Sequence, residues 1–108
     1  MTAVPEIDCS TLEGLLAAGC VLVDVREPDE WADGHIEGAI HMPLATVPDR
    51  SGELPTDRPV YMVCGVGGRS ARAAEFLRAQ GVDAINVAGG TQAWIASGRA
   101  VVPGAGES

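Results

Sequence analysis

The sequence contains no lysine: its seven basic side chains other than histidine are all arginine, against fifteen acidic residues, and the formal net charge is −8. Nucleic acid or an anionic membrane would require a basic face, so we expect neither as a general partner. Without lysine, a P-loop for nucleotide phosphates is also excluded. A local anion site stays open, because such a site needs only a few hydrogen-bond donors.

Long apolar runs and aromatic side chains are also scarce. No apolar run approaches the roughly 18 residues that a membrane span requires. The N-terminal MTAVPEIDCS has neither the basic start nor the apolar stretch of a signal peptide, so we expect a cytoplasmic protein. With one Phe, one Tyr and two Trp in 108 residues, the core must consist of Val, Ile, Leu and Ala. This composition suits one small layered α/β domain over 1–108, and we expect a monomer.

Disulfide, metal and nucleotide patterns are absent. Cys9, Cys20 and Cys64 form no C-x-x-C pair, so we expect free thiols in a reducing compartment. His35 and His41 lack partners at metal-ligand spacing, and we expect hydrogen-bonding roles for both. The stretch GVGGRS lacks the third glycine of a dinucleotide fingerprint. We expect neither a metal nor a cofactor.

Strand-like and helix-like segments alternate along the chain. The segments of strand character are 3–7, 20–25, 38–43, 59–64 and 84–90, and those of helical character are 8–19, 27–34, 69–81 and 91–98. Residues 44–58 are rich in turn signals and hold at most one helical turn, and the tail 101–108 is expected to be loose. The alternation predicts a small parallel sheet with helices on both faces. Ligands of such sheets bind beyond the carboxyl ends of the strands.

Several helices carry more specific signals. In the first, Ser10 and Glu13 have the spacing of a capping box. Trp31 and Trp94 are interpreted as packing residues of the short helices that contain them. In the helix of 69–81, an apolar face is predicted from Ala73, Ala74, Phe76 and Leu77.

Cys64 ends the apolar run PVYMVC and opens the loop CGVGGRS, which leads into a helix. Gly65, Gly67 and Gly68 allow backbone conformations in which several N–H groups turn inward and form a cradle for an anion. The helix N-terminus adds unpaired N–H groups and the positive end of the helix dipole. A thiol at the base of this cradle would be stabilised as the thiolate, its reactive form.

Arg69 and Arg72 place positive charge where the helix dipole disfavours it. An anion bound between them would explain the arrangement, since a guanidinium binds oxyanions through two parallel hydrogen bonds. Taken alone, Cys64 reads as an inert buried thiol and the glycines as a tight turn. The combination of cysteine, glycine loop, arginine and helix start favours a reactive site.

Three motifs in order resemble the single-domain rhodaneses, the thiosulfate:acceptor sulfurtransferase family: VLVDVREPDEWADGHIEGAIHMPL, CGVGGRS and VAGGTQAWIASG. The resemblance implies a rhodanese-like three-layer α/β fold. It also implies that the Cys64 thiolate takes the outer sulfur of thiosulfate or of a persulfide donor and passes it to cyanide or a thiol acceptor. Arg69 would bind the sulfonate end of the donor, within a binding loop of Gly65, Val66, Gly67, Gly68, Arg69 and Ser70.

Asp24, Arg26 and Arg72 are supporting candidates. Asp24 and Arg26, from the first motif, could orient Arg69 at the rim of the cleft. We favour a buried ion pair that joins strand to helix, because such networks are common in folds and costly to truncate. Glu27 or Glu30 are candidates for further partners of that pair.

Cys9 and Cys20 are interpreted as bystanders, unless one lies close enough to Cys64 to resolve a persulfide.

Four residues separate Cys64 from Arg69, as the resemblance to sulfurtransferases implies. Related dual-specificity phosphatases and arsenate reductases have one residue more, which leaves those activities as a distant alternative. Gly65 stands where thiosulfate-preferring members often have a cation, so we expect modest thiosulfate activity.

The main alternative to a small-molecule enzyme is a sulfur carrier or relay module. Its partner would be a sulfur-relay protein or a thioredoxin-like reductant. A catalytically silent interaction domain is less favoured, because silent copies usually lose the cysteine and this chain retains it.

Overall fold

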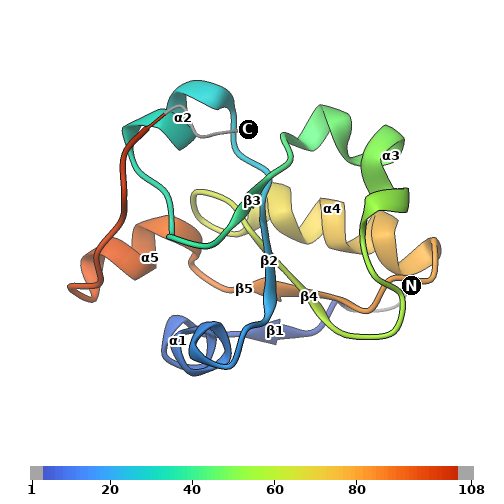
Figure 1. Ribbon diagram of the computed structural model, residues 1–108, viewed down its shortest axis with the longest axis horizontal. Helices are drawn as coiled ribbons and strands as arrows, with labels where there is room; N and C mark the ends of the chain where they lie inside the picture. Colours follow the sequence, from blue (N-terminus) through green and yellow to red (C-terminus); the bar gives the residue numbers. More distant parts are fainter. Residues whose placement is uncertain (1–3, 105–108) are drawn as a thin grey trace.

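Within residues 4–104, the part of the chain that the computed structural model describes, five strands form one parallel sheet in the order β1-β5-β4-β2-β3 (Figure 1). The strands are β1 Glu6–Ile7, β2 Val21–Asp24, β3 Ile40–His41, β4 Val60–Val63 and β5 Ala84–Val87. All of β4 is buried, which explains its continuous apolar run, because a central parallel strand is covered on both faces. The predicted α/β fold with a small parallel sheet is confirmed.

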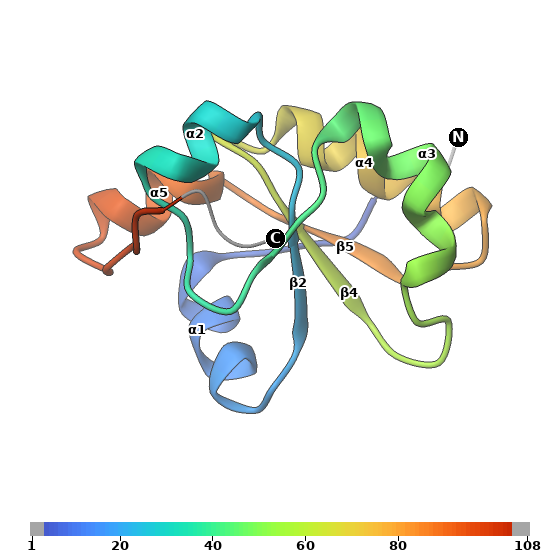
Figure 2. The ribbon, with the colours of Figure 1, turned by 45° about the horizontal axis from the view of Figure 1, so that its top comes forward.

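Helices cover both faces of this sheet (Figures 1 and 2). They are α1 Cys9–Ala17, α2 Pro28–Asp33, α3 Val47–Arg50, α4 Gly68–Ala79 and α5 Gly90–Ala96. One core cluster joins α3 and α4 to the sheet, and a second joins α1 and α5 to the opposite face. Successive residues of β4 alternate between them, with Met62 in the first and Val63 in the second, as the two-residue period of a strand requires.

The start of α1 differs from the sequence prediction. Asp8 is the N-cap, and its carboxylate accepts a hydrogen bond from a first-turn amide at 2.8 Å. Ser10 already lies inside the helix, so the predicted capping box of Ser10 and Glu13 is wrong. The earlier acidic side chain satisfies the free amide in its place. A reciprocal capping box forms instead at α2, between Glu27 and Glu30.

The segment expected to hold at most one helical turn is more helical than that. Leu44–Thr46 and Ser51–Glu53 are 3₁₀ turns that flank α3, so helical structure runs over 44–53. Pro48 sits in the first turn of α3, where its missing N–H would have no partner within the helix. Val47 is buried in the same core cluster as α4. This packing stabilises a segment that is too short to be helical by propensity alone.

The apolar face of α4 is narrower than predicted. Ala73, Ala74 and Leu77 are buried, but Phe76 is 36% exposed. The first three lie on one stripe of the helix, and position 76 falls at its margin. Phe76 instead borders a hollow of about 240 Å³ between α3 and α4.

Helix α2 is anchored near the carboxyl ends of the strands by Trp31. Its ring stacks against His35 and against His41, with centroid distances of 3.5 and 4.6 Å. His35 Nδ1 hydrogen-bonds to the Trp31 carbonyl, and His41 Nε2 to that of Arg26, at 2.9 and 2.8 Å. The hydrogen-bonding roles expected of both histidines are confirmed.

The start of the tail makes backbone hydrogen bonds to an earlier part of the chain. Val102 pairs with His35 in an antiparallel bridge, and the Gly104 amide donates to the Ala32 carbonyl at 3.0 Å. These contacts involve 102–104 of the tail expected to be loose over 101–108. That expectation stays a prediction, and 105–108 lie outside the described residues. The partners of Val102 and Gly104 lie far earlier in the chain, so no local pattern predicts these contacts.

No helix in 4–104 is long and apolar enough to cross a membrane. In that part of the chain, no three His, Cys, Asp or Glu side chains are arranged to hold a metal ion. Cys9, Cys20 and Cys64 are free thiols, as expected.

Candidate active site

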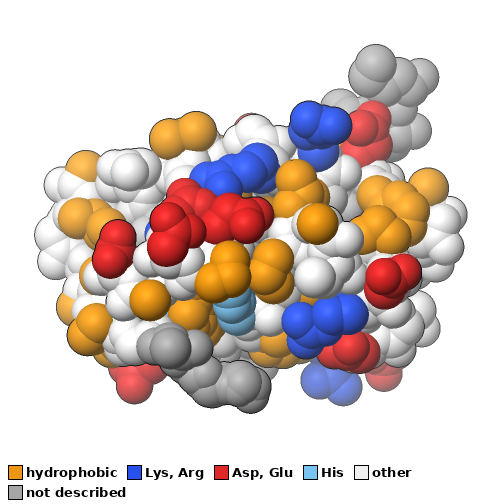
Figure 3. Space-filling view, turned by 90° about the horizontal axis from the view of Figure 1, so that it is seen from above, with side chains coloured by type: hydrophobic (Ala, Val, Ile, Leu, Met, Phe, Trp, Pro, Cys, Tyr) orange, Lys and Arg blue, Asp and Glu red, His pale blue; other side chains and the backbone are white. Residues whose placement is uncertain are grey.

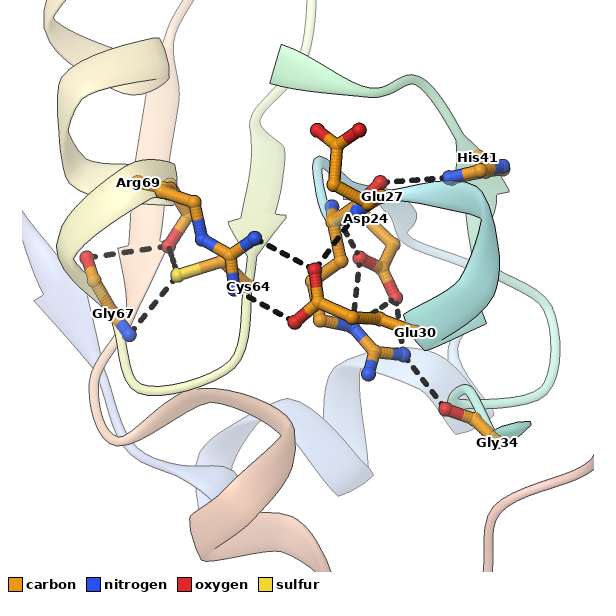
Figure 4. A network of polar contacts seen from close by, with 10 residues as sticks. Asp24, Glu27, Glu30, Gly34, His41, Cys64, Gly67 and Arg69 are labelled. Atoms are coloured by element: carbon orange, nitrogen blue, oxygen red, sulfur yellow. Dashed lines mark hydrogen bonds and ion pairs between the residues drawn. The ribbon is translucent and has the colours of Figure 1, made fainter. Parts of the chain in front are cut away.

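Cys64 directly follows β4, so it lies at the carboxyl edge of the sheet, where ligands of parallel sheets bind. The residue is buried, with 1% of its surface exposed. The chain then turns into α4, whose N-cap Gly67 has a φ of +115°, a left-handed conformation that glycine adopts readily. This turn brings the Gly67 amide back toward the Cys64 sulfur (Figure 4).

Hydrogen-bond donors converge on the Cys64 sulfur. The Gly67 amide donates to Sγ at 3.1 Å, and the Ser70 hydroxyl lies 3.3 Å from Sγ. Burial acts to raise the pKa of the Cys64 thiol. Hydrogen bonds from Ser70 and from the loop amides outweigh burial, and the pKa falls below its usual value. The loop thus favours the thiolate form.

The first turn of α5 holds the backbone of the loop. The Thr91 amide donates to the Cys64 carbonyl at 2.8 Å, and the Gln92 amide donates to the Gly65 carbonyl at 2.9 Å. Gly90 has a φ of +59° and lies so close that a Cβ there would overlap the same two carbonyls. This close approach of two backbones requires glycine at position 90, while Gly89 has a φ of +78° and a Cβ there would overlap the Ala93 side chain.

Arg69 lies beside the Cys64 sulfur and is paired with a carboxylate (Figure 4). Its Nη1 and Nη2 donate to the two oxygens of Glu30, on α2, at 2.7 and 2.9 Å. These hydrogen bonds raise the pKa of Arg69 and lower the pKa of Glu30 to about 2, so both groups are charged at neutral pH. The partners are 39 residues apart, and no local pattern predicts the pair.

Asp24 and Arg26 form a buried ion pair. Arg26 Nη2 lies 3.0 Å from the Asp24 carboxylate. The same nitrogen donates to the Gly34 carbonyl at 2.7 Å, which ties the end of α2 to β2. This geometry supports the structural interpretation of the pair rather than a position at the rim.

Asn86, in β5, is a buried polar residue that the sequence patterns do not single out. Its Oδ1 accepts a hydrogen bond from the Ser70 hydroxyl. Its Nδ2 donates to a Glu6 oxygen at 2.8 Å and to the Gly67 carbonyl at 3.2 Å. The one available signal is a polar residue inside the apolar run AINV, since buried amides need partners.

The other loop candidates differ in their surroundings. Arg72 lines the hollow between α3 and α4, and within 4–104 it has no ion pair. Val66 is 71% exposed. Gly65 lies under the Arg69 guanidinium, because a Cβ there would be 3.1 Å from Nη2. A Cβ at Gly68 would meet nothing within 4 Å.

The two other cysteines are placed differently from Cys64. Cys20 precedes β2, and the first residue of β2 pairs with the first residue of β4. Cys20 therefore lies at the amino ends of the strands, whereas Cys64 lies at their carboxyl ends. Four strand residues span about 13 Å, which is too far for Cys20 to resolve a persulfide on Cys64. Cys9 is buried at the start of α1, with Sγ 3.8 Å from the Gly90 carbonyl oxygen. Burial raises the pKa of both Cys9 and Cys20.

Comparison with known proteins points to one family. Residues 8–97 match the model of the rhodanese-like domain. The chain is 39% identical over 102 residues to a protein named sulfurtransferase from Allochromatium vinosum, covering 92% of this chain and 95% of that one. It is 47% identical over 74 residues to YqhL of Bacillus subtilis, a protein named only as uncharacterized. That match covers 68% of this chain and 59% of YqhL.

A solved structure supports the same assignment. The crystal structure of a rhodanese-like domain protein from Staphylococcus aureus superposes with a TM-score of 0.80 at 38% identity, covering 84% of this chain and 91% of that one. Fold, motif order and family match therefore agree, and the chain belongs to the rhodanese-like domain family.

Proposed function

We propose that the protein is a sulfurtransferase in which Cys64 carries the transferred sulfur. Its donor is thiosulfate or a persulfide, and its acceptor is cyanide or a thiol. The observation that carries this proposal is the environment of the buried Cys64 sulfur. The sulfur accepts a hydrogen bond from the Gly67 amide at 3.1 Å and lies beside the Arg69 guanidinium. A thiolate stabilised in this way is the nucleophile that sulfur transfer needs.

The reaction proceeds in two displacements. The Cys64 thiolate attacks the outer sulfur of thiosulfate, and the S–S bond breaks with its electron pair leaving on sulfite. The acceptor then attacks the terminal sulfur of the Cys64 persulfide. Cyanide leaves as thiocyanate, or a thiolate leaves as a persulfide, and the Cys64 thiolate is restored. Such double displacement predicts ping-pong kinetics with parallel initial-rate plots.

Arg69 retains donors for the substrate. A guanidinium has five N–H groups, and the two shortest contacts to Glu30 engage one on each terminal nitrogen. The others are available to the sulfonate oxygens of a donor. The loop amides hold the negative charge that stays on sulfur in the persulfide.

The test is intact mass after incubation with thiosulfate, for the wild type and for Cys64→Ser. We expect the wild type to gain the mass of one sulfur atom, to lose it on addition of cyanide, and the variant to gain nothing. The Cys20→Ser variant is the matched control and should gain the sulfur as the wild type does. A gain in Cys64→Ser would contradict the assignment of the nucleophile.

A sulfur-carrier module is the second candidate. Gly65 offers no cation beside Cys64, and Glu30 offsets the charge of Arg69, so a free dianionic donor is weakly attracted. A carrier would accept the persulfide from a protein partner and would turn over slowly with small donors. Fast turnover with thiosulfate and cyanide alone would favour the enzyme.

A further inference from the structure

The ion pair of Arg69 and Glu30 lies beside the Cys64 sulfur. Figure 4 shows the guanidinium with Cys64 on one side and the Glu30 carboxylate on the other. The two contacts of 2.7 and 2.9 Å form a parallel, two-point pair. Two-point pairs of this type fix orientation as well as charge, because the planar guanidinium matches the carboxylate.

The Glu30 carboxylate is held from its own helix as well. Its Oε1 accepts a hydrogen bond from the Glu27 amide at 3.0 Å, as the reciprocal half of the α2 capping box. The carboxylate is therefore in place before a donor arrives. With a pKa of about 2, it is ionised at any pH at which the protein would work.

Gly65 leaves room for this arrangement. A Cβ at position 65 would lie 3.1 Å from Arg69 Nη2 and 4.0 Å from Glu30 Oε2. A side chain at position 65 would crowd the Arg69 guanidinium. Glycine at this position therefore leaves space for the ion pair. Figure 3 shows the molecule from above, and on that face acidic side chains lie directly against arginine side chains.

We propose that Glu30 is a positioning residue that sets donor specificity: by pairing with Arg69 it cancels the positive charge beside Cys64. The site then discriminates against dianionic thiosulfate relative to sulfane donors that carry one negative charge. This inference rests on the proposed sulfur transfer through Cys64. In this role Glu30 does not contact the reacting atoms. It offsets the positive charge of Arg69 and fixes the orientation of the guanidinium.

Two donors that differ by one charge test this role. Thiosulfate and methanethiosulfonate each give their outer sulfur to a thiolate, and the leaving groups are sulfite and methanesulfinate. We would measure kcat/KM for each donor, with cyanide as acceptor, in the wild type and in Glu30→Gln. Glutamine keeps an oxygen for the Glu27 amide and for Arg69 but loses the charge.

In Glu30→Gln, we expect the ratio of kcat/KM for thiosulfate to that for methanethiosulfonate to rise roughly five- to tenfold, the effect of one unit charge at a partly solvated site. The change should lie mainly in the KM for thiosulfate. Asp29→Asn is the matched control, since it removes one charge from an exposed position of the same helix. It should change the ratio less than twofold.

The outcomes separate the two proposals. If neither donor yields turnover or a Cys64 persulfide in the wild type, sulfur transfer from small-molecule donors fails, and the role of Glu30 fails with it. If both donors react and the ratio is unchanged in Glu30→Gln, only the role of Glu30 is overturned. An equal shift in Asp29→Asn would also overturn it. Should Glu30→Gln not fold, Glu30→Ala serves as the second variant, with the same direction expected.

Discussion

The Ser70 hydroxyl has one proton and three acceptors within reach. Its oxygen lies 3.3 Å from the Cys64 sulfur and 3.3 Å from the Gly67 carbonyl oxygen, and it also contacts Asn86 Oδ1. A hydroxyl donates to one acceptor at a time, so Asn86 competes with the sulfur for this proton. When the thiol ionises, the charge on sulfur makes it the stronger acceptor. The hydroxyl is thus a donor that responds to the state of Cys64.

Replacement of Ser70 by alanine should raise the pKa of Cys64. Hydrogen-bond donors lower the folded-state pKa, and the loss of the Ser70 hydroxyl shifts it back toward the value of a free thiol. The thiolate absorbance as a function of pH, taken as the difference from Cys64→Ser, measures this midpoint. Asn86→Ala is the companion variant, because it removes the competing acceptor and should not raise the midpoint. An unchanged midpoint in Ser70→Ala would leave the loop amides as the sole cause.

Two turns at the carboxyl edge shape the loop between β4 and α4. The first turn of α5 reaches the loop through the amides of Thr91 and Gln92, while Gly67 is the N-cap of α4 in a left-handed conformation. Glycine is needed in both places for reasons of backbone geometry. Gly67 adopts a positive φ, and Gly90 allows the close approach of two backbone segments. Gly68 has no such demand, since its surroundings are open.

Gly90→Ala and Gly68→Ala should therefore behave oppositely. At Gly90 the added methyl overlaps the Cys64 carbonyl and the φ is positive, so we expect a loss of about 2–4 kcal/mol in the free energy of unfolding, and loss of sulfur transfer. At Gly68 we expect a change within about 1 kcal/mol, toward higher stability. Urea unfolding of both variants measures the difference. Equal stabilities would contradict the close approach of the α5 turn.

The long-range field of the protein opposes an anionic donor, although the cradle favours one locally. The net charge is −8 on a molecule with extents of 33 × 26 × 24 Å. At about 0.01 M salt the Debye length of about 30 Å covers these dimensions, whereas at about 0.15 M it is about 8 Å. Salt therefore removes the distant repulsion and leaves the contacts beside Cys64.

Added salt should accordingly raise kcat/KM for thiosulfate. Between about 0.01 and 0.15 M ionic strength we expect a roughly two- to fivefold increase, and a smaller one for singly charged methanethiosulfonate. Steady-state kinetics over a salt series with a neutral buffer measures both. A fall in kcat/KM with salt would mean that positive potential near Cys64 dominates the approach of the donor.

Strand order explains which features could be predicted. The order β1-β5-β4-β2-β3 sets the end of β4 between the ends of β2 and β5. It thereby brings α2 and Asn86 to the loop from distant parts of the chain. Parallel strands, buried runs and the helix after Cys64 follow from local periodicity, and all were predictable. The direction of the Phe76 side chain depends on its neighbours, and the prediction there was wrong. The pairing of Val102 also depends on a distant segment, and no local pattern predicts it.

The local pattern was enough to establish the alternation of strands and helices, the position of Cys64 at a strand end, and the glycine loop that turns donors toward it. These are properties of short segments, where residue spacing and backbone freedom act directly. The partner of Arg69, the Asn86 contact to Ser70 and the close approach of Gly90 arise from packing between segments far apart in sequence. Each depends on how the sheet orders its strands, and for that reason tertiary structure alone assigns them.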